Sequence, residues 1–330
     1  MLKFIVKRLL LCVIILFFVM FAIYLLMRNL PSSYVETTAR ELAVRPGNTK
    51  SAQQWIAELN AQYGLDRSPI EGFVTWLSSA VKGEFGDSWY WTVKVTDKFN
   101  EVIWYSFFLG LIAFILEIMI AIPLGVIAAK KQYSITDYTV TVIGLVGISM
   151  PSFFVATVLK MVFAVKLGWF DPIGMETARL AGTLSGFRWL LDVAWHFVLP
   201  AMTLTILGIG SLMRYTRTNT LEVLNADYIR TARAKGLSER RVIGYHAFRN
   251  TLIPIVTILG GSLPGLFSGA LITETLFSIR GIGYASYYSM IGGDIPFTMF
   301  YLSFISILTL LGTLISDILY AVVDPRVRVN

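Results

Sequence analysis

Six apolar stretches divide the chain, and each is about as long as an α-helix that crosses a bilayer, which needs roughly 20 mostly apolar residues. The first, LLLCVIILFFVMFAIYLLM, is longer than the apolar core of a cleaved signal peptide, and no small-x-small cleavage site follows it. It is therefore expected to stay as a membrane helix. The pattern predicts six transmembrane helices, roughly over residues 9–27, 103–129, 138–165, 195–213, 252–277 and 298–323.

The polar connections between these stretches differ in charge. With the N-terminus placed in the cytoplasm, the inside segments hold fifteen Lys and Arg, eight of them between Arg214 and Arg249. The opposite connections near 167–194 and 278–297 hold only three. Because short cytoplasmic loops carry an excess of Lys and Arg, both termini are expected to be cytoplasmic.

The long connection after the first stretch, residues 28–101, is expected to be external and to contain two short amphipathic helices. SAQQWIAELNAQYGLD begins with a cap candidate, Ser51, and stops at Gly64. SPIEGFVTWLSSAVKG repeats the pattern, with Ser68 as the cap and Gly83 as the stop. These helices are interpreted as a cap over the helix bundle or as a contact for an external partner or substrate.

Composition agrees with a membrane protein. Of the 330 residues, 55% are hydrophobic and 15% are charged, whereas a soluble domain carries about a quarter charged residues. The net charge of +7 does not indicate nucleic-acid binding, because the basic residues stand at the ends of apolar runs. The single cysteine, Cys12, excludes a disulfide framework and a Cys/His metal site.

One polar insert, residues 214–251, interrupts the apolar pattern. TNTLEVLNADYIRTARA has helical spacing and predicts one helix, which Gly236 ends in the usual place of a left-handed C-terminal cap. A second helical run starts at Ser238 and leads back into the membrane at Pro254. The insert is thus predicted to be a helix–turn–helix. It is interpreted either as a basic paddle on anionic headgroups or as a rigid element that a partner grips.

The insert and its surroundings resemble a known family. LEVLNADYIRTARAKGLSERRVIGYHAFRNTLIPIVT is similar to the signature loop of permease subunits of binding-protein-dependent ABC importers, most closely the oligopeptide/dipeptide/nickel group. GISMPSFF, LGWF, HFVLPAMTL, TETLFSIRGIG, DILYAVVDPRVR and the external YGLDRSPIEGFVTWLSSAVKGEFGDS follow in that family's order. The resemblance covers nearly the whole chain.

The loop departs from the general importer motif, which is written E-A-A, three residues, Gly, then nine residues and I-x-L-P. Arg230, Thr231 and Ala232 stand at the E-A-A positions, so the glutamate is missing. His246 replaces the isoleucine, and the proline is displaced to Pro254. The role of the loop is expected to carry over, but no particular glutamate contact is.

The resemblance implies an all-α fold of the type I ABC importer permease class. It implies an N-terminal end and first helix in residues 1–30, a small external helical segment in 31–100, a permease core in 101–324 and a cytoplasmic tail in 325–330. A coupling helix of about 222–237 is expected to seat in a groove of an ATPase subunit. Its candidate contacts are Leu224, Ala226, Asp227, Tyr228, Arg230, Thr231, Ala232 and Gly236.

Ionisable residues within membrane spans are costly and are functional candidates. Glu117 lies within the second predicted span and Asp317 within the sixth; each is interpreted as a structural polar contact or as part of the translocation path. Lys160 is expected to extend toward the outer headgroups. In the family, TETLFSIRGIG lies near the gate, and small residues in the fifth span favour close packing or a pathway-facing helix. The pathway and gate candidates are Glu274, Phe277, Gly281, Gly283, Gly261 and Gly265.

The implied function is that of a multi-pass permease subunit of a bacterial-type plasma membrane that forms half of an import pathway for di- and oligopeptides. The implied partners are a second homologous permease, two ATPase subunits, an external solute-binding protein, peptide substrate and the lipid bilayer. Because no G-x-x-x-x-G-K-[ST] occurs, the chain is expected to be no enzyme and to hold no cofactor or metal, with ATP and Mg in the ATPases. Nickel-chelate, glutathione or another small solute is the alternative cargo. An intramembrane protease is a distant alternative, because His196, His246, Asp294 and Asp317 lie in no catalytic motif. A stand-alone channel is another, because nothing resembles a selectivity filter and the polar insert would be unexplained.

Overall fold

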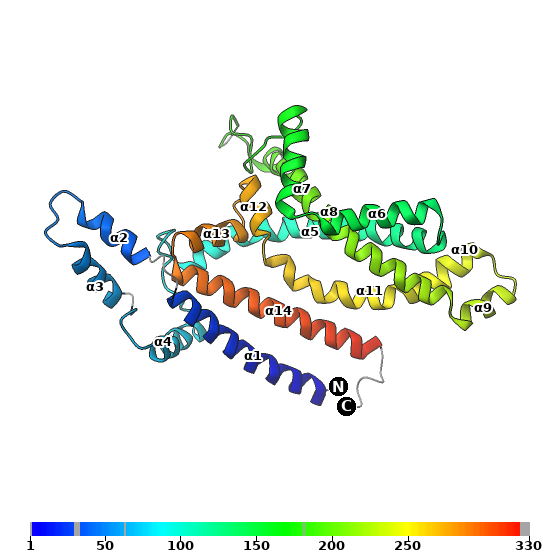
Figure 1. The fold of residues 1–330 in the computed structure, drawn as a ribbon, viewed down its shortest axis with the longest axis horizontal. Coiled ribbons are helices and arrows are strands. Elements are labelled where there is room, and N and C mark those ends of the chain that lie inside the picture. Colours follow the sequence, from blue (N-terminus) through cyan, green and yellow to red (C-terminus); the bar gives the residue numbers. More distant parts are fainter. Residues whose placement is uncertain (1, 30–33, 63, 181, 324–330) are drawn as a thin grey trace. The chain divides into compact units, whose positions relative to one another are not determined.

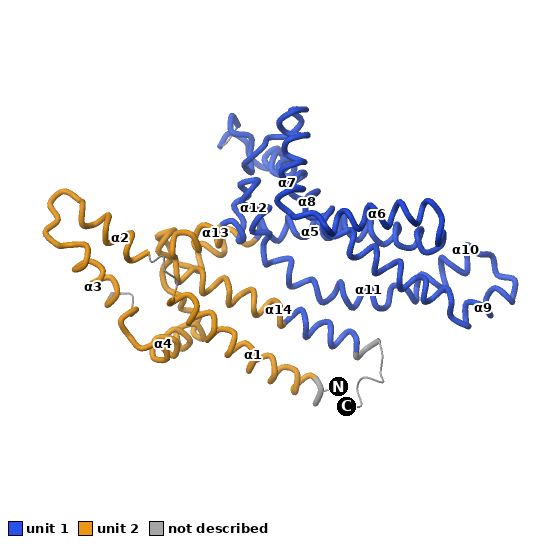
Figure 2. The backbone as a smooth tube through the Cα atoms, viewed as in Figure 1, with its two compact units in different colours: residues 1, 104–284, 311–330 blue, residues 2–103, 285–310 orange. Residues whose placement is uncertain are grey.

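The computed structural model describes residues 2–29, 34–62, 64–180 and 182–323. These residues fold into helices and loops, and the β-pairing among them is limited to an isolated bridge between Asp87 and Lys94. The predicted all-α class is confirmed. The predicted tail, 325–330, lies outside the described residues. Figure 2 shows two compact units, one of residues 104–284 and 311–330 with residue 1, the other of residues 2–103 and 285–310.

Five continuous helical stretches are long and apolar enough to cross a membrane, and a bent pair of helices adds a sixth candidate. Five of the six predicted spans correspond to these continuous stretches, and the third corresponds to the bent pair. The fourth helix is much longer than its apolar stretch, because it continues into the polar insert. The main helices of these candidates are α1 (Leu2–Arg28), α5 (Val95–Lys130), α6 (Ile135–Ser149) with α7 (Ser152–Leu159), α8 (Gly186–Leu224), α11 (Phe248–Ser262) and α14 (Ile295–Val323).

The third predicted span is not one straight helix. Its two halves, Ile135–Ser149 and Ser152–Lys166, meet at an angle of 105°. Pro151 lacks a backbone N–H, and its ring disfavours the helical conformation at the preceding residue. Met150 accordingly has an extended ψ of 132°. After α7 the chain continues as the π-helix η1 (Lys160–Lys166).

The fifth predicted span, 252–277, is wrong at both ends. The helical run starts earlier, and it stops before Gly269, which has a left-handed φ of +76°. A Cβ atom there would lie 2.6 Å from the backbone nitrogen of Gly283, so only glycine fits this break. Gly269 therefore lies outside the helix that contains Gly261, although the sequence places both among the small residues of the fifth predicted span. The elements in this region are α10 (Glu239–Arg241), η2 (Val242–Ala247), α11, the 3₁₀ helix η3 (Leu263–Phe267) and α12 (Leu271–Phe277).

The 104–284/311–330 unit is built on close contact between α6 and α8, which lie side by side (Figure 1). A Cβ atom on Gly210 would lie 2.3 Å from the carbonyl oxygen of Gly144, and one on Gly144 would lie 2.2 Å from Met213. Small residues at such crossings let helix backbones approach closely and gain van der Waals contact. Buried side chains around Val155, on α7, and Phe197, on α8, form the adjoining core.

The other unit contains the helices predicted to be external, and their local signals are confirmed. Ser51 Oγ accepts a hydrogen bond from Gln54 N, while Gln54 Oε1 accepts one from Ser51 N, which forms a capping box. Ser68 Oγ accepts from Glu71 N. The pattern did not predict an additional helix, α2, which packs on α3 through Leu59. The helices are α2 (Tyr34–Ala43), α3 (Ala52–Gln62) and α4 (Pro69–Val81).

Two further short helices lie in the connections between the long ones. The polar insert contains α9 (Asp227–Ala234). The predicted loop before the sixth span contains α13 (Ile282–Ile291), which the unit boundary crosses. Both connections are therefore helical.

Candidate functional site

The first part of the polar insert, before Gly236, does not form the single helix that its spacing predicts. α8 runs to Leu224 and is capped at Asn225, and Ala226 then takes an extended conformation with ψ 147°. α9 follows as a separate element of 8 residues. Asn is a common residue at such helix ends, since its short polar side chain bonds well to nearby backbone groups. The insert thus presents a short helix between two longer ones (Figure 1).

α9 has one buried face. Ile229 is 0% exposed and Ala232 is 7% exposed, and both pack against Val242 and Ala247 of η2. Leu224, at the end of α8, packs against the same cluster. Leu224 and Ala232 were predicted as partner contacts, but the structure turns them toward the chain's own core.

The opposite face of α9 is exposed. The Asp227 side chain is 98% exposed and the Arg230 side chain 73%, and Tyr228 and Thr231 are also exposed. Partial burial, and then the nearby Glu222 carboxylate, raises the pKa of the Tyr228 hydroxyl above its ordinary value. The predicted contacts therefore divide into an anchoring face and a face that is open to a partner.

The turn after α9 has the predicted geometry. Gly236 has a φ of +75°, a left-handed conformation that side chains other than glycine adopt at a cost. The Arg233 Nε atom lies 2.7 Å from Glu239 Oε1, so an exposed ion pair joins the two sides of the turn. The sequence analysis missed this pair.

The second site surrounds the first half of α12. Glu274 is 0% exposed. Its carboxylate accepts hydrogen bonds from Ser106 Oγ at 2.7 Å, Ala270 N at 2.9 Å and Tyr284 N at 3.0 Å. Ser106 Oγ in turn accepts one from Ile282 N at 2.7 Å. One carboxylate therefore joins α5, the start of α12 and the start of α13.

The two glycines after α12 leave room for this carboxylate. A Cβ atom on Gly281 would lie 2.3 Å from Ser106 Oγ and 2.5 Å from Glu274 Oε2, and one on Gly283 would lie 3.0 Å from Glu274 Oε2. The structure thus brings Glu274, Gly281 and Gly283 together.

The other two glycines predicted for the pathway and gate lie apart from this carboxylate. Gly261 packs against Gly312 and Ser316 of α14, and nothing lies within 4 Å of a Cβ atom built on Gly265. Gly261 is therefore a helix-packing residue in this structure, and Gly265 has open space beside it.

The C-terminal end of α12 is also held. Lys160 Nζ donates to the carbonyl oxygen of Leu276 at 2.6 Å and lies 5.4 Å from the centre of the buried Phe277 ring. The N–H of Gly174 donates to the Phe277 carbonyl at 2.9 Å. Lys160 was expected to extend toward headgroups; instead it satisfies one of the carbonyls that a helix end leaves unpaired.

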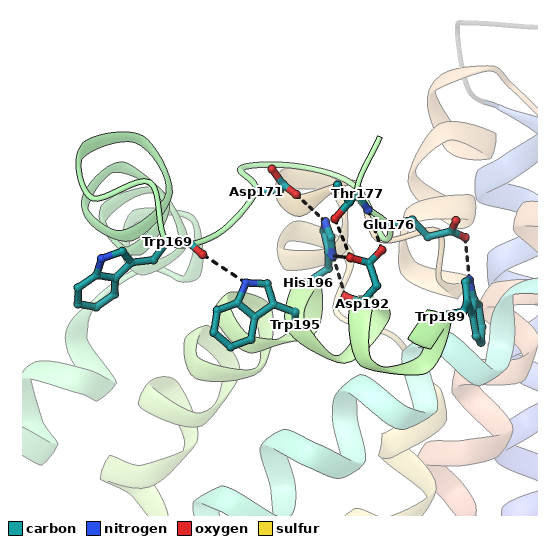
Figure 3. Close-up of polar contacts among 8 residues, drawn as sticks. All are labelled: Trp169, Asp171, Glu176, Thr177, Trp189, Asp192, Trp195 and His196. Atoms are coloured by element: carbon teal, nitrogen blue, oxygen red, sulfur yellow. Dashed lines mark hydrogen bonds and ion pairs between the residues drawn. The ribbon is translucent and has the colours of Figure 1, made fainter. Parts of the chain in front are cut away.

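A third polar cluster was not predicted. Figure 3 shows His196 and Asp192, on α8, in contact with the segment that joins η1 to α8. From the sequence, His196 was a candidate only for a protease site. Asp171 is 25 residues from His196 in the sequence, and Asp192 lies just outside the motif that contains His196, so no short pattern joins the three.

Of the two predicted intramembrane acids, Glu117 lies against a neighbouring helix of its unit. A Cβ atom on Gly208 would lie 2.4 Å from a Glu117 carboxylate oxygen, so α8 passes directly over this acid. Asp317 lies partly buried in α14. An ion pair between two helices was not predicted: Arg217, on α8, contacts the buried Asp137, on α6, with two hydrogen bonds of 2.6 and 2.7 Å.

A further buried acid, Asp294, occurs in the unit of residues 2–103 and 285–310. It is 0% exposed and accepts hydrogen bonds from Ser88 Oγ, Tyr90 N and Phe297 N. Burial raises the pKa of the Asp294 carboxyl above its ordinary value, and these hydrogen bonds oppose that rise. It joins the loop before α5 to the start of α14, which makes it a structural residue rather than part of a protease pair.

The chain is similar to known transport proteins. Residues 121–329 match the family described as the binding-protein-dependent transport system inner membrane component. The chain is 38% identical over 271 residues to the oligopeptide transport system permease protein AppB of Bacillus subtilis, covering 81% of this chain and 83% of that protein. It is 33% identical over 329 residues to OppB, the permease protein of the same type of system in Haemophilus influenzae, covering 99% and 100%. It is 31% identical to the dipeptide transport system permease protein DppB of Escherichia coli, covering 99% of each.

These matches extend over the long apolar helices, the α9 insert and the α12 cluster. The family match alone spans well over half of the chain. The chain belongs to the family of binding-protein-dependent transport system inner membrane components, as a multi-pass permease protein.

Proposed function

We propose that this chain is the permease subunit of an ATP-driven peptide importer, working with a second homologous permease, two ATPase subunits and an external solute-binding protein. The observation that carries the proposal is the division of α9 into two faces. Ile229 and Ala232 anchor it to its own unit, while Tyr228 and Thr231 stay exposed. A helix of this kind can bind a partner on its exposed face while its buried face stays packed on its own unit. α9 is thus the coupling helix that seats in the ATPase.

The orientation follows from the basic residues. Lys and Arg are concentrated in the α9 insert, at the N-terminus and between α5 and α6, which favours the cytoplasm for these segments. α2, α3 and α4 would then be external, on the side of the binding protein. In this orientation residues 1–30 form the cytoplasmic N-terminal end and first helix, 31–100 the external segment, 101–324 the permease core and 325–330 a cytoplasmic tail.

The α12 cluster is the proposed gate at the outer end of the pathway. Its carboxylate, Glu274, is fully enclosed, so its role is to hold α12 and α13 in register rather than to touch cargo. The chain itself is non-catalytic: nucleotide and Mg bind in the ATPase subunits, and the chemistry stays there. The energy reaches the pathway through α9.

Peptides are the proposed cargo, because the relatives are named for oligopeptide, di/tripeptide and dipeptide transport. The test is ATP hydrolysis in liposomes by a complex of this chain with its partner permease, ATPases and binding protein, with and without a mixture of di- to hexapeptides. Peptides are expected to stimulate hydrolysis. The variant Gly236→Leu, which strains the turn after α9, is expected to lose at least ~5-fold of the coupling.

Gly244→Leu is the matched control, because Gly244 lies in the same insert, has no left-handed φ within the π-helix η2 and has open space around it. It is expected to keep peptide stimulation. A complex that hydrolyses ATP but ignores peptides contradicts the cargo and leaves another small solute. A chain that assembles with no ATPase contradicts the subunit role itself.

A further inference from the structure

The segment between η1 and α8 is fastened to the first turns of α8 by a polar cluster (Figure 3). The His196 side chain is 1% exposed and contacts an oxygen with each ring nitrogen. Nδ1 lies 2.8 Å from the carbonyl oxygen of Asp192, in its own helix, and Nε2 lies 3.1 Å from Asp171 Oδ2. A buried ring with both nitrogens engaged is held in one orientation, so Asp171 is fixed against α8.

Asp192 makes the second attachment. Its two carboxylate oxygens accept from the backbone N–H of Thr177 at 2.8 Å and from the Thr177 hydroxyl at 2.6 Å. Such two-point bonds to a carboxylate are geometrically specific and stronger than neutral hydrogen bonds. Residues 171–177 are therefore held to α8 at both ends.

Two tryptophans of α8 add further contacts with the same segment. Trp189 Nε1 donates to Glu176 at 3.1 Å, and Trp195 Nε1 donates to the Trp169 carbonyl at 3.2 Å. Along α8 the four residues follow in the order Trp189, Asp192, Trp195 and His196, and Figure 3 shows all four facing the same segment. The segment is thus fixed over about two turns of helix rather than at a single point.

The middle of the same segment holds the end of α12. The N–H of Gly174 donates to the carbonyl oxygen of Phe277 at 2.9 Å, and the N–H of Arg280 lies 3.1 Å from the sulfur of Met175. Gly174 has a φ of +103°, so its backbone takes a path that other residues avoid. The segment therefore connects two helices: α8 through its ends and α12 through its middle.

α8 also leads to α9. It is a single helix of 39 residues, or roughly 60 Å at 1.5 Å per residue, with the 171–177 attachments near its start and α9 directly after its end. A displacement that moves α8 as a body is passed to whatever is fastened to it. No other described helix carries both the 171–177 attachments and the link to α9.

We propose that Asp192 and His196 are positioning residues for transport: they fasten residues 171–177 to α8, and this connector passes the movement of α9 to the C-terminal end of α12. The inference rests on the proposed roles of α9 as coupling helix and α12 as gate. It goes beyond them by naming the residues that join the two. A purely structural loop would make the same contacts but would not alter coupling when it is loosened in an assembled complex.

The test replaces the hydrogen bonds by a covalent bond that can be added at will. In a Cys12→Ser background, which removes the chain's single natural cysteine, Thr177 and Asp192 are both changed to Cys and the complex is assembled with its partner subunits. Without cross-linker, peptide-stimulated ATP hydrolysis is expected to fall at least ~5-fold, while basal hydrolysis and the yield of complex stay unchanged. A short bis-methanethiosulfonate cross-linker is expected to restore most of the stimulation. Thr177→Cys alone is the control: the same reagent is expected to leave its peptide-stimulated ATP hydrolysis at the value measured before treatment.

Full stimulation in the untreated double variant, or no recovery after cross-linking, would overturn the proposal. If the double variant does not assemble, Asp171→Asn decides, because Asp171 is half-exposed and lies outside the helices. Reduced stimulation in this variant supports the connector, and unchanged stimulation overturns it.

Failure of the proposed function gives a different result, since the wild-type complex would then not respond to peptides at all. The connector is in that case measured by the maleimide labelling rate of Ser278→Cys, at the end of α12, with and without ATP. An ATP-dependent change that Asp192→Ala abolishes supports the connector. A change that survives Asp192→Ala, or no change in the parent, overturns it.

Discussion

Two short helices, α9 and α12, stand between the long helices of this permease, and they are built on opposite principles. α9 has 8 residues and α12 has 7, and each has one acidic residue in its first turn. The Asp227 side chain of α9 is 98% exposed, whereas Glu274 of α12 is 0% exposed. The same kind of residue at the same kind of position is therefore a surface group in one helix and a structural bond in the other.

The difference shows how a helix too short to be stable alone can be maintained. Helices under about 12 residues are marginal in water, so each needs contacts from elsewhere. α12 receives them from α5, η1 and the 171–177 segment, and its polar groups are paired within the chain. α9 receives them on one face only, through Ile229 and Ala232. A helix whose polar groups are bonded to several neighbouring segments keeps its place, and one held on a single face offers the other face to a partner.

The largest predicted effect is the loss of stability when the acid in the first turn of each helix is replaced. Glu274→Ala leaves the Ser106 hydroxyl and at least two backbone N–H groups buried without an acceptor, each at a cost of about 1–3 kcal/mol. The chain is expected to lose on the order of 3 kcal/mol or more of stability. Asp227→Ala, on α9, is the matched control and is expected to cost under about 1 kcal/mol.

The measurement is the fraction of each purified variant that stays monodisperse in detergent after heating. Glu274→Gln is expected to fall between the two alanine variants, because an amide oxygen can accept some of these bonds while its NH₂ cannot. Equal melting of Glu274→Ala and Asp227→Ala would contradict the structural role of the buried acid.

The features that the sequence predicts well are local. The caps at Ser51 and Ser68 and the left-handed turn at Gly236 involve partners within a few residues, so short patterns contain the whole interaction. The six apolar stretches are equally plain, because the bilayer fixes their length.

The features that the sequence does not reveal depend on distant partners or on backbone competition. Ser106 and Glu274 are 168 residues apart, and no periodicity joins them. The bend at Pro151 and the break at Gly269 fall inside apolar runs whose hydropathy continues unchanged through them. The split at Asn225 occurs within a segment whose apolar residues keep helical spacing, so periodicity alone does not reveal it; the packing of Ile229 and Ala232 onto η2 accompanies the break.

A smaller effect is predicted for Gly281 and Gly265, two glycines that the sequence assigned to the same pathway and gate region. Gly281→Ala forces a methyl group against Ser106 and Glu274, and overpacking of this kind costs about 1–3 kcal/mol. Gly265→Ala, with open space and a helical backbone, is expected to be neutral or slightly stabilising. The same heating assay separates them. If Gly265→Ala proves the more damaging, the tight surroundings of Glu274 are not what holds α12.

The smallest effect is predicted on the exposed side of α9. Arg233 and Glu239 close the turn at Gly236 with side chains that are 44% and 56% exposed, and exposed ion pairs contribute about 0.2–1 kcal/mol. A double-mutant cycle with Arg233→Ala and Glu239→Ala in the purified chain is expected to give a coupling energy under about 1 kcal/mol, falling further in high salt.

The same double-mutant cycle in the assembled complex tests whether a partner covers the exposed face of α9. If α9 seats in an ATPase groove, the pair loses contact with water there, and its coupling energy is expected to rise, because charges attract more strongly when they are desolvated. The cycle is then read from the affinity of the ATPase for the permease. A coupling energy above about 2 kcal/mol in the chain alone would mean that the turn is held as firmly as α12. In that case α9 would be a rigid part of its own unit, like α12, and not an element that a partner subunit can move.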